Sequence, residues 1–168
     1  MALELNTNSY VTVDNADSYF ETRIDSAAWF DASDEVKEQA LVTATQLVDD
    51  NAWIGSAVSP SQALAWPRKY AIYYDQRLGQ EISFSVTEIP ERLKTAIYEQ
   101  ALHLVNNEDL LAGTTQTFES ISIGNISISD SNNDVTRVPM KPSIVMKLIK
   151  PLIKVGASGL GAGLWSAN

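Results

Sequence analysis

The sequence has 168 residues, of which 45% are hydrophobic; this is enough for one domain with a packed core, and it excludes a disordered acidic chain. It has no cysteine, which excludes disulfide bonds and thiolate metal sites. No stretch approaches the roughly 20 apolar residues that span a bilayer, and the start has no basic, apolar leader, so we expect a soluble protein made in a cytoplasm, with no membrane partner.

The net charge of −9 hides an opposition between two parts of the chain. Residues 1–135 hold all 21 acidic residues and seven basic ones, a net −14, whereas residues 136–168 hold five basic residues and no acidic one. Such a split favours contact of the basic part with an acidic surface, for example a neighbouring copy of the acidic part. A basic segment that is merely solvated is the alternative interpretation.

The N-terminal part of the chain predicts two helices. After a short β-like run, Asp14–Asn15 are typical helix caps, and apolar residues at helical spacing predict a helix over residues 16–24. A second helix is expected over residues 34–48. Asp31 or Ser33 can cap it, and its apolar side chains recur every three or four positions.

The middle of the chain, residues 55–88, is expected to be irregular, with an extended segment at residues 82–86. Pro67 ends any helix before it, because proline constrains the preceding residue away from helical angles. A third helix is expected from Pro90, which occupies a favoured first helical position, to about Val105.

The pattern changes after the third helix. Apolar and polar residues alternate across residues 117–130 around Gly124–Asn125, which predicts a β-hairpin. Ser143–Ile149 then predict a short amphipathic helix. Residues 155–168 contain four glycines and no charge, yet they include Trp165, a residue type that often anchors a segment on a partner.

These elements predict a mainly α fold: a small bundle of three to four helices with a β-hairpin insertion and an extended C-terminal tail. We divide the chain into a helical body, residues 1–135, which includes the hairpin at residues 117–130, and a basic, glycine-rich C-terminal docking arm, residues 136–168. We expect the arm to bind a partner through charged and apolar side chains. The residues of this partner-docking hypothesis are Lys147, Lys150, Lys154, Leu164 and Trp165.

The sequence lacks the residue combinations of an enzyme, and we expect no catalysis, no cofactor and no bound metal. Hydrolytic triads need a base beside the nucleophile, and His103, the one histidine, lies inside a predicted helix. Adjacent carboxylates such as Asp49–Asp50 point different ways on a helix, so we interpret them as a solvated helix end. The glycine-rich residues 156–163 lack the lysine followed by serine or threonine that ends a P-loop motif.

Aromatic and basic residues are mixed near the middle of the chain, as they are on surfaces that bind single-stranded nucleic acid. The set comprises Trp53, Trp66, Arg68, Lys69, Tyr70, Tyr73, Tyr74 and Arg77. The −14 charge of residues 1–135 argues against this function, because it repels phosphates. We therefore expect Trp66 to pack in the core and Arg68 to pair with a carboxylate of the same or an adjacent subunit.

The order of these motifs is similar to that of a family of phage proteins. The matching segments are residues 10–20, 40–55, 62–68 and 89–101. The core signature of the resemblance is Trp53, Trp66, Pro67 and Arg68. The resemblance covers residues 9–111, with a weaker likeness at residues 138–153. Lys69 and Tyr70 depart from the pattern, which has a glycine soon after the arginine.

This family is often labelled as DnaT-like single-stranded-DNA-binding proteins, and it also resembles the head-to-tail connector (adaptor, or head-completion) proteins of tailed bacteriophages. The resemblance implies a structural protein of the virion neck, a homo-oligomeric ring of about twelve copies that binds portal and tail proteins. DNA would pass through the lumen of this ring during ejection without sequence-specific binding. Binding of single-stranded DNA is the alternative function.

Overall fold

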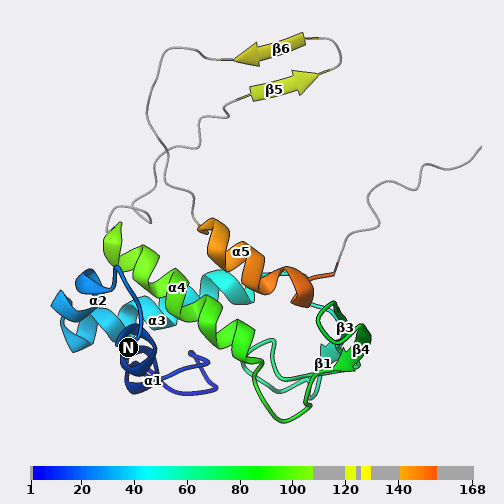
Figure 1. Cartoon of the computed structure of the whole chain (residues 1–168), viewed down its shortest axis with the longest axis horizontal. Coiled ribbons are helices and arrows are strands. Elements are labelled where there is room, and N and C mark those ends of the chain that lie inside the picture. The colour runs from blue at the N-terminus through cyan, green and yellow to red at the C-terminus, as the bar shows by residue number, and fades with distance from the viewer. Residues whose placement is uncertain (1, 108–119, 124–125, 130–140, 155–168) are drawn as a thin grey trace, which may run out of the picture.

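The computed structural model describes residues 2–107, 120–123, 126–129 and 141–154 (Figure 1). Groups of helices alternate with groups of short strands along the chain. The helices are α1 (Val13–Phe20), α2 (Ala27–Asp31), α3 (Asp34–Asp49), α4 (Glu91–Asn106), α5 (Ser143–Ile149) and the 3-10 turn η2 (Lys150–Leu152). The strands are β1 (Ser56–Ala57), β2 (Arg68–Lys69), β3 (Ile72–Asp75), β4 (Gln80–Ser83), β5 (Ser120–Ile123) and β6 (Ile126–Ser129).

The fold is mixed α/β, so the prediction of a mainly α bundle is wrong. Within the described residues, three two-stranded antiparallel sheets accompany the helices: β1 with β2, β3 with β4, and β5 with β6. The segment 55–88, expected to be irregular, contains the first four strands. Strands of two to four residues are too short to display a period of two in the sequence, which is why the pattern does not reveal them.

The core lies between the long helices α3 and α4, which pack against each other, and α5 packs on α4 (Figure 1). Leu41 of α3 and Leu93 and Ile97 of α4 are fully buried. Val145 and Ile149 of α5 are fully buried as well. The described part of the docking arm therefore contributes to the same core as the helices of the body.

Local signals fix several helix ends. Ser33 caps α3 as predicted, because its hydroxyl accepts a backbone N–H three residues further on, at 3.4 Å. The first helix begins at Val13, earlier than predicted, because the hydroxyl of Thr12 accepts the backbone N–H of Asn15 at 3.3 Å. The predicted helix Ser143–Ile149 is confirmed as α5.

Two charged side chains buried around α1 both have partners. The Lys37 ammonium lies 3.2 Å from the Asp17 carboxylate, which also accepts the indole N–H of Trp29 at 2.7 Å. Glu99 of α4 forms an ion pair with Arg23. Because buried charges are tolerated only when they are paired and hydrogen-bonded, these contacts specify how α1 sits against α3 and α4.

The β-hairpin predicted within residues 117–130 is confirmed by the described strands β5 and β6. Their register places Ile121 opposite Ile128 and Ser122 opposite Ser127. The glycine-containing turn at residues 124–125 lies outside the described residues.

Candidate nucleic-acid interface

The tryptophans of the core signature belong to a row of packed aromatic rings. Trp53 and Trp66 are 4% and 2% exposed, and their ring centroids lie 6.0 Å apart, edge to face. Trp66 meets Phe84 edge to face at 5.4 Å, and Phe84 stacks on Tyr73 at 4.7 Å. Pro67 follows Trp66 through a cis peptide bond. Both tryptophans therefore lie inside the protein, where no nucleic-acid base can stack on them.

Arg68 is held by main-chain oxygen atoms. Its guanidinium donates to the carbonyl of Ile54 at 2.7 Å, to that of Gly55 at 3.0 Å and to that of Ala65 at 3.0 Å. The sequence predicts a carboxylate partner in the same or an adjacent subunit; within the subunit, the hydrogen-bond partners are three carbonyl groups. These contacts fasten the backbone that follows α3 to strand β2.

Asp49, at the C-terminal end of α3, joins this block to the N-terminal segment. Its carboxylate accepts the hydroxyl of Tyr10 and the backbone N–H of Ala65, the latter at 3.0 Å. The Tyr10 oxygen accepts the backbone N–H of Trp66 at 3.0 Å. Burial raises the pKa of the Asp49 carboxyl, and burial with the neighbouring charge of Asp49 raises the pKa of Tyr10. Asp49 is therefore a structural hydrogen-bond acceptor and not the solvated helix end that the sequence suggests.

The fold divides the mixed aromatic and basic set of the sequence into a buried and an exposed part. Lys69, Tyr70, Tyr74 and Arg77 face solvent, and Tyr70 and Tyr74 are 82% and 61% exposed. Along β3, Tyr73 points inward and Tyr74 outward, because successive side chains of a strand point to opposite faces. The exposed part retains two aromatic rings next to two cations.

A second group of cations lies beside β3, on α5 and η2. The turn η2 contacts β3, and Ile153 after it forms an isolated antiparallel bridge with Trp53. Lys147, Lys150 and Lys154 are exposed. We name these two groups together the basic face, which consists of Lys69, Tyr70, Tyr74, Arg77, Lys147, Lys150 and Lys154. The other two residues of the docking hypothesis, Leu164 and Trp165, lie outside the described residues.

Charge is separated between the elements of the molecule. Residues 2–67, which include α1, α2 and α3, contain 11 acidic and two basic residues, a net −9. Residues 68–83 and 141–154, which form β2–β4, α5 and η2, contain seven basic and two acidic residues, a net +5. Because ionic screening limits interactions between exposed charges to about 10 Å at 0.1 M salt, a ligand on the basic face meets mainly the local positive charge.

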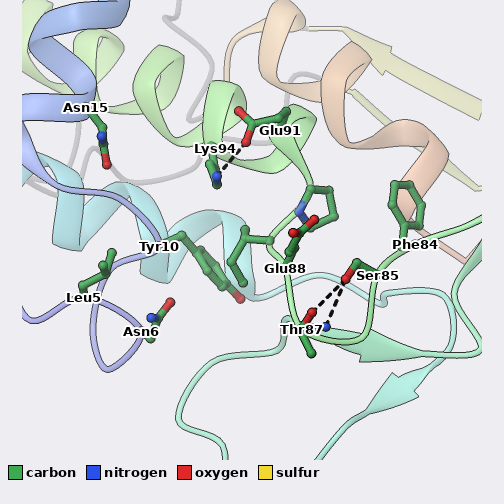
Figure 2. A pocket seen from close by; sticks show the side chains of 12 residues that line it. Leu5, Asn6, Tyr10, Asn15, Phe84, Ser85, Thr87, Glu88, Glu91 and Lys94 are labelled. Atoms are coloured by element: carbon green, nitrogen blue, oxygen red, sulfur yellow. Dashed lines mark hydrogen bonds and ion pairs between the residues drawn. The ribbon is translucent and has the colours of Figure 1, made fainter.

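A cleft of about 550 Å³ lies between the N-terminal segment, the loop before α4 and the start of α4 (Figure 2). Glu88, Glu91 and Lys94 line it, and the Lys94 ammonium donates to the Glu91 carboxylate at 2.6 Å. Tyr10 and Phe84 contribute aromatic surface to its walls. Carboxylates outnumber cations along this lining, so the cleft does not suit a ligand that carries phosphate.

Among the described residues, no group of three or more His, Asp and Glu side chains is arranged to hold a metal ion. In the same part of the chain, no helix is both long and apolar enough to cross a membrane. His103 is half-buried in α4, with the side-chain amide of Asn107 3.4 Å from its Nδ1. The glycine-rich residues 156–163 lie outside the described residues.

The fold and this surface define a small mixed α/β protein with an exposed, tyrosine-bearing basic face. Residues 2–164 match the family described as "Putative DnaT-like ssDNA binding protein", and the chain belongs to that family. The match extends beyond residues 9–111, so it takes in the hairpin and most of the docking arm. No curated protein and no solved structure matches the chain.

Proposed function

We propose that this protein binds single-stranded DNA on the basic face and catalyses no reaction. One observation carries the proposal: Tyr70 and Tyr74 are exposed on a segment, residues 69–77, that also carries the exposed cations Lys69 and Arg77. Proteins that bind single strands without sequence preference combine a positively charged surface that follows the backbone with aromatic rings on which bases stack. The description of the family supports the same ligand.

Asp75, the acidic residue nearest to Tyr74 in sequence, neutralises little of this positive charge. The Asp75 carboxylate accepts the backbone N–H groups of Arg77 and Leu78, at 2.9 Å and 3.2 Å, within the turn after β3. Its nearest approach to the Arg77 guanidinium is 4.0 Å, and the Arg77 side chain is almost fully solvated. An exposed pair of this kind is weak, so Arg77 remains able to bind a phosphate.

Replacing Tyr70 or Tyr74 with alanine is expected to weaken binding of a labelled oligothymidine by about 1–3 kcal/mol for each tyrosine. Each substitution removes one surface on which a base stacks. Both side chains are exposed, so the free energy of unfolding should change by less than about 0.5 kcal/mol. Fluorescence anisotropy measures the affinity, and urea denaturation measures the stability.

Phe30→Ala is the matched control, because Phe30 is an exposed aromatic residue on α2, within the acidic residues 2–67. Its removal should leave the affinity for the oligonucleotide unchanged. Binding by the unaltered protein should weaken steeply with added salt, as phosphate contacts require. Absence of binding to any single-stranded oligonucleotide at about 0.15 M salt would disprove the proposal.

The separation of charge favours a second function, that of a head-to-tail connector in the neck of a tailed bacteriophage. As the alternative, we propose a ring of about twelve copies in which the basic face of one copy contacts the acidic residues 2–67 of the next. A contact between two different surfaces closes into a ring when the rotation between copies allows it. In this case portal and tail proteins are the partners, and the genome passes through the lumen without sequence-specific contacts.

The connector proposal predicts that a chain lacking residues 155–168 folds normally but no longer joins the portal protein. The deletion removes Leu164 and Trp165, the apolar residues of the docking hypothesis, and leaves the described core in place. Co-sedimentation with the portal protein of the same phage measures joining, and denaturation confirms folding. Normal joining by the shortened chain would contradict the docking hypothesis, while its affinity for oligonucleotides tests the first proposal separately.

A further inference from the structure

A hollow of about 380 Å³ lies at the junction of α5 and η2, next to β3. We call it the lysine hollow, and it is lined by Met146, Lys147, Lys150, Ile153 and Lys154. We propose that it holds one unstacked base of a bound single strand, while its lysines contact the phosphates on either side of that base. This inference rests on the proposed binding of single-stranded DNA, and it adds the place and the chemistry of one nucleotide.

The apolar lining of the hollow, Met146 and Ile153, is held in place by neighbouring residues that pack in the core. Met146 is 43% exposed, and Ile153 is half-buried and paired with Trp53 through a backbone bridge. Val145 and Ile149 of the same helix are fully buried in the core. Methionine sulfur is polarisable and makes favourable contacts with aromatic rings, so the hollow offers an apolar contact for a flat base.

The rim of the hollow is positively charged. Within the described residues, none of Lys147, Lys150 and Lys154 takes part in an ion pair. Residues 141–154 contain four lysines and no acidic residue. The lysines select a ligand that carries negative charge, and the apolar contact selects one that also carries a poorly hydrated flat group. A nucleotide has both properties.

Binding of a base in the hollow favours single-stranded over double-stranded DNA. A duplex keeps its bases stacked and paired, so a base can enter the hollow only after it has been extruded, whereas a single strand presents its bases freely. Because η2 contacts β3, a strand that stacks on Tyr74 can continue to the hollow. The acidic surface of a second copy supplies negative charge and one exposed ring, that of Phe30, so the measurements must distinguish this occupant from a nucleotide.

The full chain is titrated with an oligothymidine of about 12 nucleotides, a length within the usual binding-site size of about 4–16 nucleotides. A second titration uses the same oligomer with abasic sugars in place of the nucleosides. Met146→Ala should weaken binding of the intact oligomer about threefold to tenfold without altering its salt dependence, because no charge is removed. Lys150→Gln should weaken binding and lower the slope of log affinity against log salt by about 0.7. Lys141→Gln, a lysine of the same segment that does not line the hollow, is the matched control and should do neither.

The two oligomers test whether a base occupies the hollow. The abasic oligomer should bind the unaltered protein more weakly than the intact one, and Met146→Ala should weaken its binding no further. If the intact oligomer binds and Met146→Ala has no effect on it, the inference is overturned while single-strand binding stands. If neither oligomer binds the unaltered protein, both are overturned. If Lys150→Gln instead disperses protein oligomers and leaves DNA affinity unchanged, the hollow contacts a second copy.

Discussion

Trp66→Ala is expected to lower the free energy of unfolding by about 3–5 kcal/mol. The Trp66 side chain is 2% exposed and meets the rings of Trp53 and Phe84 edge to face. Alanine would leave a cavity between these two rings and remove the edge-to-face contact that each makes with Trp66. Because the backbone N–H groups of Ala65 and Trp66 are hydrogen-bonded to Asp49 and Tyr10, this backbone cannot easily collapse to fill the space.

Trp66→Phe separates the loss of packing from the loss of the indole N–H. Among the described residues, this buried N–H has no hydrogen-bond partner, so its removal breaks no hydrogen bond. Phenylalanine should therefore cost only about 1–2 kcal/mol. Urea denaturation with an unchanged m-value measures both variants. If Trp66→Ala abolished oligonucleotide binding and left stability unaltered, Trp66 would be a base-stacking residue.

The sequence predicts the longer helices well because their signals are local. The cap at Ser33 and the apolar spacing after it predict α3, and Pro90 marks the residue before α4. Ser143–Ile149 show enough of a helical period to give both ends of α5. Each of these segments contains about two turns or more, over which the period of 3.6 residues becomes visible.

The short strands β1–β4 depend on contacts between segments, which no local pattern encodes. Gly55, with a φ of +69°, lies so close to β2 that a Cβ atom at this position would be 2.5 Å from the carbonyl oxygen of Lys69. Arg68 then binds the carbonyl groups of the approaching backbone. Arg68 belongs to the core signature of the sequence, but its partners are carbonyl groups, which every residue has, so no pattern of residue types marks them.

The sequence indicates each of the two groups of residues in the basic face, but it does not indicate that the elements carrying them lie side by side. The segment with Lys147, Lys150 and Lys154 contains no acidic residue, and Tyr70 and Tyr74 belong to the mixed aromatic and basic set. The elements that carry them meet because α5 packs on α4 and η2 contacts β3. The net charge of residues 1–135 also conceals this surface, because five of the seven basic residues in that part of the chain lie at or after Arg68.

Arg68→Ala is expected to lower the free energy of unfolding by about 2–4 kcal/mol, an effect second only to that expected for Trp66→Ala. The guanidinium donates to three carbonyl groups, those of Ile54, Gly55 and Ala65, at 2.7–3.0 Å. Hydrogen bonds from a charged donor each contribute about 1.5–3 kcal/mol, but Arg68 is half-buried, so water can replace some of the lost contacts. The loss should loosen the pairing of β1 with β2, since these carbonyl groups lie in the segments that lead into β1 and β2.

Arg68→Lys tests whether geometry or charge holds this block together. A lysine ammonium keeps the charge but lacks the planar fork that reaches carbonyl groups on two separate segments, so we expect it to restore less than half of the lost stability. Lys69→Ala, an exposed neighbour in the same strand, should change the free energy of unfolding by less than about 0.5 kcal/mol. Hydrogen exchange of the β1 and β2 amides should speed up in Arg68→Ala before that of α3, because local opening needs less free energy than global unfolding. If Arg68→Lys were as stable as the unaltered protein, the carbonyl contacts would not be what orders these strands.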